Sequence, residues 1–320
     1  NLVLSTTIVF PKAAAVRHGS GRGGKLSAII GRVYAATAAR NDYMFSRAFH
    51  ASSSYGPDGS EVLHDRELSI GIQYLHVSRD AADNQKPHGS DRLGVVADIV
   101  LDNRSEILAA LRCDPASSDA DLVAGLFERF GPSLVDRITG DYAMAVYVKP
   151  ERKLFLFRDH IGTRPLYWRQ VGTDVIFGSD IGSLTLFSDM SWDIDEQAFA
   201  RFVMAPNRAP EKTMFVGLEE VAPGHIVEIG QDGIRSRRWW DPRNAPDIRF
   251  TDNREYLERF RELVDAAVRK RSNVVGRLGS HISGGMDSST VTYLAGRNLH
   301  RAYSWSPSIS DSYPDLGPRD

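Results

Sequence analysis

The sequence predicts a chain of two domains: an α+β domain built on two β-sheets, followed by the start of an α/β domain with a parallel sheet. A length of 320 residues allows two domains. From residue 26 to about residue 180, short β-like runs are separated by turns and interrupted by one helix. Beyond residue 250, a long helix, a Ser-Gly-Gly turn, a second helix and a strand-like run at 301–307 follow in the order of a parallel α/β sheet.

Strands of the first domain are predicted where short apolar runs are bounded by turn residues. A helix is predicted over 119–130, because apolar residues recur at helical spacing after an aspartate cap at Asp119. The order of strands, helix and further strands favours a layered domain of two sheets. The predicted strands cover 26–34, 67–72, 93–98, 142–147, 154–157 and 174–179.

The domain boundary is predicted at Asp241–Pro246, a stretch rich in proline and charge. The second domain begins with an amphipathic helix from about Thr251 to Arg271, whose apolar residues fall on one side. These features assign 26–240 to the first domain, 241–252 to a linker and 253–320 to the second domain.

Residues 1–25 differ from the rest of the chain. Two apolar runs come first and basic residues follow them, which is the reverse of the order in a secretory signal. The glycine-rich segment 19–24 reads as a flexible joint. We therefore expect 1–25 to be a flexible N-terminal extension.

Composition excludes several classes of function. A net charge of −2 argues against a nucleic-acid or membrane-surface role, since both need a basic excess. No run approaches the ~20 apolar residues of a membrane span. Cys113 is the only cysteine, so an intramolecular disulfide is impossible and a reducing cytoplasm fits best.

A serine- and glycine-rich turn at 282–289 is the strongest chemical signal in the sequence. Two adjacent glycines permit positive φ and let backbone N–H groups converge before a helix opened by Ser288 and Ser289, which makes an anion site. Asp287 would repel phosphate unless a cation lay between them, so it is a candidate Mg²⁺ ligand. The plainer alternative is a surface turn capped by Ser288. The candidate site residues are Ile282, Ser283, Gly284, Gly285, Asp287, Ser288 and Ser289.

The string Ser-Gly-Gly-Met-Asp-Ser-Ser at 283–289 resembles the pyrophosphate loop of ATP pyrophosphatases, which cleave ATP between the α and β phosphates and leave AMP on a carboxylate. No Gly-Lys-Ser/Thr follows, so it is not a Walker loop. The resemblance implies ATP and Mg²⁺ as the bound species.

The first domain resembles the glutaminase-type domain of the asparagine synthetase family, with its Ntn fold. The resemblance rests on Gly56–Gly59, Gly140–Ala145, Leu154–Trp168, Phe177–Ile181 and Val221–His225. Together with the pyrophosphate loop, it covers the chain from about residue 26 to the end.

Three positions depart from the working glutaminases of that family. Their nucleophile is an N-terminal cysteine, whereas here Ser27 occupies its position and 26 residues precede it. Tyr55 replaces the arginine that holds the glutamine carboxylate. Asp98 replaces the asparagine of the oxyanion pair and would repel a developing oxyanion. We therefore expect an inactive, structural domain, in which neither Cys113 nor His160 substitutes as a catalyst. His281, just before the loop, is likewise expected to have no catalytic role.

A synthetase without its own ammonia source needs another amine. Within the family, the runs 158–167 and 304–307 look closest to lasso peptide macrolactam cyclases, with the β-lactam synthetases as further relatives of this kind. This resemblance implies a small-molecule or ribosomal-peptide substrate, with a precursor peptide and a leader peptidase as partners.

Three functions remain open at this stage. The leading one is an ATP-dependent, AMP-forming carbon–nitrogen ligase; the others are glutamine-hydrolysing asparagine synthesis and a non-catalytic binding or assembly module that retains the fold. The family's synthetase domain continues well beyond the counterpart of Asp320, so we expect the chain as given to bind ATP poorly and to catalyse nothing.

Overall fold

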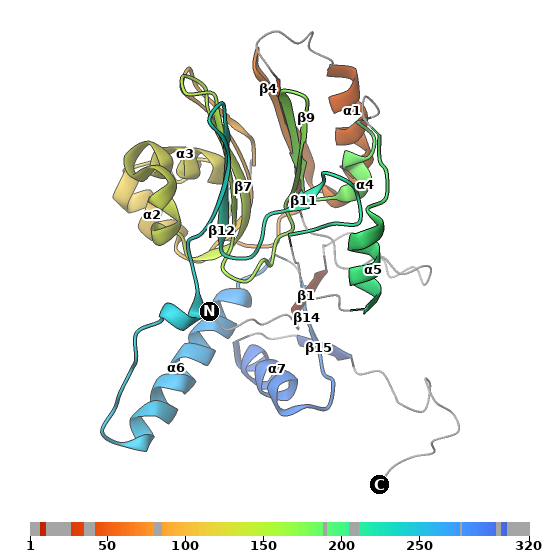
Figure 1. Ribbon diagram of the computed structural model, residues 1–320. Helices are drawn as coiled ribbons and strands as arrows, with labels where there is room; N and C mark the ends of the chain where they lie inside the picture. The colour runs from red at the N-terminus through yellow and green to blue at the C-terminus, as the bar shows by residue number, and fades with distance from the viewer. Residues whose placement is uncertain are drawn as a thin grey trace. The chain divides into compact units, whose positions relative to one another are not determined.

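The computed structural model of the chain is shown in Figure 1. It describes residues 7–10, 27–34, 42–79, 85–187, 191–204, 211–275, 277–298 and 302–305. The chain divides into two compact units. The first, called here the sandwich unit, comprises Lys25–Leu75 and Asp80–Ala245. The second, called the loop unit, comprises Asn1–Gly24, His76–Arg79 and Pro246–Asp320. The division between Ala245 and Pro246 falls inside the predicted linker.

The sandwich unit contains two six-stranded sheets among its described residues, each built from antiparallel pairs. The first has the order β11-β9-β10-β2-β4-β3, with β2 at Ala28–Val33, β3 at Gly59–His64, β4 at Leu68–Tyr74, β9 at Tyr167–Val171, β10 at Asp174–Gly178 and β11 at Glu219–Glu220. The second has the order β13-β12-β8-β7-β6-β5, with β5 at His88–Gly89, β6 at Leu93–Leu101, β7 at Gly140–Val148, β8 at Lys153–Arg158, β12 at His225–Gly230 and β13 at Gly233–Arg238.

The sheets lie face to face with helices outside each of them (Figure 1). Helices α1 (Asp42–Ala51) and α4 (Ile181–Leu184) cover the first sheet, and α2 (Arg104–Leu111) and α3 (Asp119–Phe130) cover the second. The described part of the unit also contains α5 (Glu196–Met204) and the 3₁₀ helices η1 (Ser52–Tyr55), η2 (Gly131–Arg137) and η3 (Pro242–Asn244). These four layers agree with the predicted two-sheet, Ntn-like architecture.

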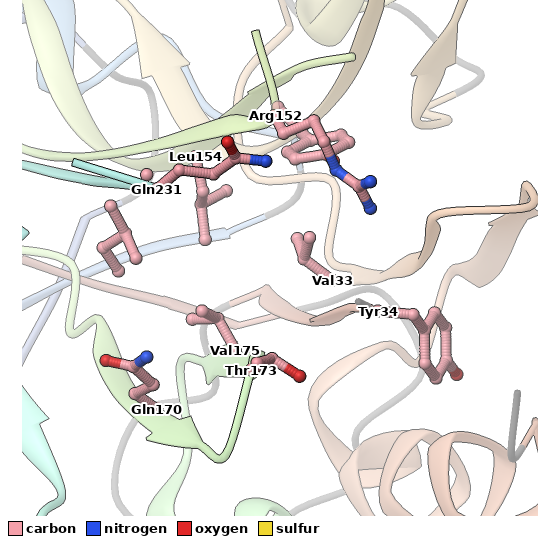
Figure 2. Close-up of a pocket in the computed structure, with 11 residues that line it drawn as sticks. Val33, Tyr34, Arg152, Leu154, Gln170, Thr173, Val175 and Gln231 are labelled. Atoms are coloured by element: carbon pink, nitrogen blue, oxygen red, sulfur yellow. The ribbon is translucent and has the colours of Figure 1, made fainter. Parts of the chain in front are cut away.

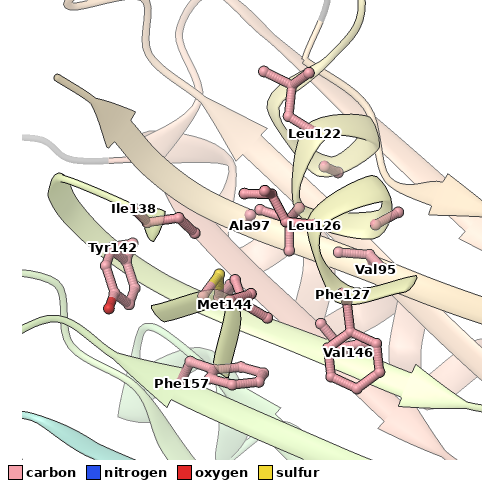
Figure 3. Packing of buried hydrophobic residues seen from close by; sticks show 14 of the residues in the cluster. Val95, Ala97, Leu122, Leu126, Phe127, Ile138, Tyr142, Met144, Val146 and Phe157 are labelled. Carbon is pink, nitrogen blue, oxygen red and sulfur yellow. The ribbon is translucent and has the colours of Figure 1, made fainter. Parts of the chain in front are cut away.

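Strand β7 shows why the layers form. Its side chains alternate between two cores, because successive residues of a strand point to opposite faces. Tyr142, Met144 and Val146 join the cluster under α3, which Figure 3 shows from close by. Ala143 and Ala145 join the cluster between the sheets. A strand covered on both faces needs a nearly continuous apolar run, and the sequence of β7 supplies one.

Helix α3 has the predicted bounds, but its cap differs. Ser118 is the N-cap, and its hydroxyl accepts a hydrogen bond from Asp121 N–H within a capping box. Asp119 is instead a buried first-turn residue whose carboxylate accepts hydrogen bonds from Arg104 Nε (3.1 Å) and Gln85 Nε2 (3.0 Å). The prediction of Asp119 as the cap was therefore wrong, because its carboxylate is buried and paired with Arg104 instead.

The loop unit contains α6 (Asn253–Arg271), β14 (Arg277–His281), α7 (Met286–Asn298) and β15 (Ala302–Trp305). Strands β14 and β15 are parallel neighbours, as predicted for the second domain. Val264 and Val268 of α6 pack with Leu278 of β14 and Val291 of α7 in a small apolar core. The amphipathic pattern predicted helix α6, but only the two valines of its apolar side are buried, whereas Leu257, Phe260 and Leu263 are exposed.

Residues Thr7–Phe10 form strand β1, which pairs with β14 in antiparallel orientation. Regular structure here differs from the flexible extension expected for 1–25; the other residues of that stretch lie outside the described part of the chain. Within the described residues, no helix combines the length and the apolar character needed to cross a membrane.

Candidate functional site

The candidate phosphate loop connects β14 to α7. Helix α7 begins at Met286, two residues earlier than the serines expected to open it, so Asp287 and Ser288 lie in its first turn. Gly284 has φ of +81°, a conformation that a residue with a Cβ adopts only at a cost. A Cβ built on Gly284 would have no heavy atom within 4 Å, and one on Gly285 would meet only Ser283 Oγ at 3.6 Å. The space beside both glycines is therefore open.

Serine hydroxyls hold the loop together from inside. Ser288 is only 5% exposed, and its Oγ accepts a hydrogen bond from Ser283 N–H at 3.2 Å and donates one to Gly285 O at 3.1 Å. The Oγ atoms of Ser283 and Ser288 lie 3.1 Å apart. Ser289 Oγ donates to Gly285 O at 2.9 Å. These bonds fix the turn before the helix, so the hydroxyl of Ser288 stabilises the loop from within.

The loop is also tied to the strand before it. The hydroxyls of Ser280 on β14 and Thr292 on α7 lie 2.5 Å apart, and Thr292 also donates to the carbonyl of Ser288 at 2.8 Å. This chain of bonds links the strand, the loop and the helix across one turn of α7. The helix start is thereby fixed relative to the end of β14.

The residues present fit a polyphosphate with its Mg²⁺. The first N–H groups of α7 have no partners within the helix and carry partial positive charge. The side-chain side of Gly284 is open, and Asp287 is exposed in the first turn. Among the described residues, no group of three or more His, Cys, Asp or Glu side chains is placed to hold a metal. A Mg²⁺ here would combine Asp287 with phosphate oxygens and water, its usual environment beside nucleotides.

Ser27, at the position of the family's nucleophile, has its hydroxyl engaged. It lies just before β2, and its Oγ accepts a hydrogen bond from Leu75 N–H at 3.1 Å. The adjoining end of β10 is bound similarly, since Ser179 Oγ accepts from Ile29 N–H at 3.0 Å. The end of the first sheet where Ser27 lies is therefore held by serine-to-backbone bonds.

Tyr55, at the position of the substrate-binding arginine, lies at the same end of the first sheet. Its hydroxyl donates to Asp180 Oδ1 at 3.3 Å, and Asp180 caps helix α4 by accepting from Ser183 N–H at 2.7 Å. Burial raises the pKa of Tyr55, and the nearby Asp180 carboxylate raises it further. A neutral phenol bound to a carboxylate cannot replace a guanidinium as the partner of a substrate carboxylate.

Asp98, at the oxyanion position, lies on β6 and is 2% exposed. The period of the strand places it on the face that carries Val96, toward the other sheet. Arg164 Nη1 lies 3.3 Å from its Oδ1. Burial raises the pKa of Asp98 to about 6; Arg164 opposes this shift, while Asp141 and Asp159 add to it. An acidic group inside the sandwich cannot supply the N–H donors that an oxyanion needs.

The glutaminase-like motif at 158–164 proves to be a structural network. The carboxylate of Asp159 accepts hydrogen bonds from the backbone N–H groups of Tyr142, Ile161, Thr163 and Arg164 at 3.0–3.2 Å. Arg158 donates to the carbonyls of Gly162, Arg164 and Val221 at 2.7–2.9 Å and to the carboxylate of Glu220. In the sequence, this run stands out only for its family likeness. The charged pair Arg158-Asp159 close to Gly162 was the available signal for a loop that binds its own backbone.

The other residues considered for catalysis have ordinary environments. His160 lies edge-on to the rings of Trp239 and Trp240, with centroids 4.6 and 5.1 Å away, and burial lowers its pKa. Cys113 is half-buried against the core under α3. Both environments agree with the packed roles expected for them. The side chain of His281 lies outside the described residues.

A cavity of about 350 Å³ opens between the sheets at the other end of β2 (Figure 2). Apolar side chains line it from both sheets, Val33 and Val175 from the first and Leu154 from the second, and Arg152 and Gln231 add polar groups. Ser27 precedes β2, whereas Val33 ends it, so the cavity lies away from the degenerate glutaminase position. None of the predicted site residues lines it.

Comparison with known proteins agrees with this geometry. Residues 26–240 match a family model described as a glutamine amidotransferase domain, and 259–316 match one described as asparagine synthase. The first match covers more than half of the chain. The chain therefore belongs to the glutamine amidotransferase domain family, and 259–316 are similar to asparagine synthase. No closer assignment, to lasso peptide cyclases or to β-lactam synthetases, follows from these matches.

Two curated relatives illustrate the likeness. The chain is 26% identical over 259 residues to asparagine synthetase [glutamine-hydrolyzing] 3 of Bacillus subtilis, covering 78% of this chain and 42% of that protein. It is 27% identical over 252 residues to the asparagine synthetase [glutamine-hydrolyzing] of Zea mays, covering 77% of this chain and 37% of that protein. The chain thus spans about two fifths of the length of these relatives.

A solved structure described as the allosteric regulatory enzyme of purine biosynthesis is also similar, with a TM-score of 0.47 and 15% identity. That alignment covers 67% of this chain and 49% of the other. A likeness at this level carries no inference about chemistry.

Proposed function

We propose that the protein is an ATP-dependent, AMP-forming ligase that makes an amide bond without hydrolysing glutamine. In this proposal, a substrate carboxylate is adenylated at Ile282–Ser289, and an amine of the substrate displaces AMP. The sandwich unit is an inactive glutaminase-like domain that keeps its fold. The localisation in accord with this chemistry and with the single cysteine is the cytoplasm.

The observation that carries the proposal is the intact loop between β14 and α7. Three features support a phosphate site at this point: a glycine at positive φ, open space beside it, and a helix start, where the exposed Asp287 could hold a cation. The match of 259–316 to an asparagine synthase model supports the same reading.

Within this proposal, each loop residue has a defined task. The N–H groups at the start of α7, with Gly284 and Gly285 leaving room for approach, would hold the β and γ phosphates of ATP. Mg²⁺, coordinated through Asp287, would offset the charge of the phosphates. Ser288 would act indirectly, by keeping the turn in shape through its bonds to Ser283 and Gly285. Holding the two outer phosphates leaves the α phosphorus open to a carboxylate.

Three departures from the pattern of working glutaminases support the use of an amine other than ammonia released from glutamine. The hydroxyl of Ser27 binds Leu75, the phenol of Tyr55 binds Asp180, and Asp98 is buried beside Arg164. An amine carried by the substrate itself is the simplest replacement, as in the lasso peptide cyclases and β-lactam synthetases that the sequence resembles. A ribosomal peptide with an internal Asp or Glu and a free N-terminus is the leading substrate class, with a precursor peptide and a leader peptidase as partners. No role for nucleic acid or membrane is proposed.

Glutamine-dependent asparagine synthesis is the second candidate, and the names of the relatives favour it. The environments of Ser27, Tyr55 and Asp98 weigh against it. A binding or assembly module without catalysis is the third candidate. The intact loop sequence weighs against that candidate, because a site that had lost its ligand would tolerate the replacement of Gly284 or Asp287.

The test is ATP–pyrophosphate exchange by the full-length protein with candidate carboxylates, starting with such a peptide. We expect AMP and pyrophosphate as products. Asp287→Asn should reduce exchange on the order of a hundredfold or more, since a lost contact to a metal-bound phosphate costs a few kcal/mol of barrier. Asp247→Asn, at an exposed aspartate of the same unit, is the matched control and should exchange normally. Formation of ADP, or normal exchange by Asp287→Asn, would refute the assignment.

A further inference from the structure

One short segment of the glutaminase-like sequence belongs to the loop unit. The chain leaves the sandwich unit after Leu75, the residue that follows β4, and returns to it at Asp80. The four residues between them, His76–Arg79, are part of the compact unit that contains α6, β14 and α7. We call His76–Arg79 the strap.

The strap binds the backbone just before β14. The N–H of Val275 donates to Val77 O at 3.0 Å, and the N–H of Arg79 donates to Asn273 O at 3.3 Å. Ser78 and Val274 form an antiparallel β-bridge at the same place. The side chain of Arg79 adds a third bond, from its Nε to Val274 O at 2.8 Å.

The strap thereby holds the connection between α6 and β14. Val274 is 7% exposed and packs in the core that also contains Leu278 of β14 and Val291 of α7. Backbone groups near a core need hydrogen-bond partners, and the strap provides them for this connection. Strand β14 starts two residues after Val275 and runs directly into the phosphate loop. A fixed start of β14 therefore fixes the position of Gly284.

The residue just before the strap is held by a hydrogen bond to Ser27, which occupies the position of the family's nucleophile. Leu75, which immediately precedes the strap, donates its N–H to the hydroxyl of Ser27. A serine hydroxyl can accept such a hydrogen bond whether or not it has a catalytic role. The position that serves catalysis in working glutaminases here anchors the segment that reaches the loop unit.

We propose that the strap is a positioning element of the phosphate loop, with Arg79 as its positioning residue. The glutaminase-like domain would then contribute to the ligase by supplying the strap rather than ammonia. This inference rests on the proposed function only for its effect on catalysis, because the effect on the order of β14 follows from the hydrogen bonds alone.

The test compares Arg79→Gln, Arg79→Lys and Arg92→Gln in the full-length protein. The first removes the charged donor, the second keeps a cationic donor of similar reach, and the third changes an exposed arginine of the sandwich unit. Amide hydrogen exchange over 273–285, followed by mass spectrometry, reports the order of β14 and its loop. Pyrophosphate exchange reports KM for ATP and kcat separately.

We expect Arg79→Gln to accelerate amide exchange over 273–285 by roughly fivefold, the effect of one lost hydrogen bond, with unchanged exchange in β6 and β7. KM for ATP should rise by a similar factor while KM for the carboxylate substrate stays near its original value. Arg79→Lys should recover most of both effects, and Arg92→Gln should show neither.

The two readouts separate the strap from the proposed function. Unchanged amide exchange over 273–285 in Arg79→Gln would overturn the proposal that the strap orders β14, whatever the ligase assay shows. Faster amide exchange together with an unchanged KM for ATP overturns its role in positioning the loop. If the unmodified protein shows no pyrophosphate exchange with any carboxylate, the proposed function fails, and faster amide exchange still supports the strap as the element that orders β14.

Discussion

Arg164 Nη1 and Asp98 Oδ1 lie 3.3 Å apart inside the sandwich unit, and both residues are 5% exposed or less. A buried pair of this kind is costly to form and more costly to break, because removal of one partner leaves an unpaired charge. The pair occupies the position where the resemblance to active glutaminases requires neutral N–H donors. The interior of the domain thus contains a buried ion pair at the position that the resemblance assigns to an oxyanion site.

The first prediction is that the full-length protein releases no glutamate from glutamine above the rate in buffer. The hydroxyl of Ser27 is bonded to Leu75, and Asp98 would oppose an oxyanion. A coupled glutamate dehydrogenase assay checks this, with Ser27→Ala as the paired variant. Glutamate release that disappears in Ser27→Ala would show that the domain retains its activity.

The second prediction concerns the pH dependence of stability through Asp98. Its folded-state pKa of about 6 lies above the ordinary value of 3.8. Between these pH values the folded protein keeps a proton that the unfolded chain has lost, so the contribution of Asp98 to the free energy of unfolding falls as pH rises from about 4 to about 6. Two pKa units correspond to about 3 kcal/mol.

Asp98→Asn should remove this dependence. The measurement is urea unfolding of the sandwich unit, followed by tryptophan fluorescence at pH 4.5 and pH 7, as the difference between the variant and the unmodified protein. Asp232→Asn, which changes an exposed carboxylate of the sandwich unit, is the control. An equal change in stability with pH for the unmodified protein and Asp98→Asn would contradict the shift.

The third prediction separates the two glycines of the loop. Gly284→Ala should destabilise the loop unit by about 1–2 kcal/mol, because alanine must adopt a φ near +81° there. Gly285→Ala is the matched variant: its new methyl would meet only Ser283 Oγ at 3.6 Å, an ordinary contact. Amide exchange over 282–290 checks the comparison. Equal effects of the two substitutions would show that backbone strain at Gly284 is unimportant.

The fourth prediction is that limited proteolysis cuts first within 241–250. The residues from Pro242 to Arg249 are exposed, and the division between the two units falls among them. The carboxylate of Asp241 binds Arg243 and Arg238, and hydrogen bonds from Arg243 lower its pKa, so the start of this segment is ordered only locally. Mass spectrometry of early fragments should show a product that ends near residue 240. A first cut within 140–180 would contradict the division into units.

The sequence determined the elements whose pattern is local. The continuous apolar run at 142–147 indicated a buried strand, and β7 is buried on both faces. Helical spacing of apolar residues gave α3 its bounds. The string at 283–289 located the loop between a strand and a helix, because glycine conformation and helix starts depend on neighbouring residues. Strands β3 and β13 were missed, since their solvent-facing residues weaken the apolar signal. Strands β9 and β12 were missed as well.

Only the tertiary structure decided which distant residues became partners. Asp119 binds Arg104 instead of capping its helix, Asp98 meets Arg164 across 66 positions of sequence, and Arg79 binds Val274 across 195. Local sequence cannot specify these pairs, because each depends on how the sheets and units bring separate segments together. The sequence by itself predicted that a phosphate loop and an inactive glutaminase-like domain share one chain. The fold decided that His76–Arg79 join the loop unit, since hydrogen bonds form only where folding places donors and acceptors within reach.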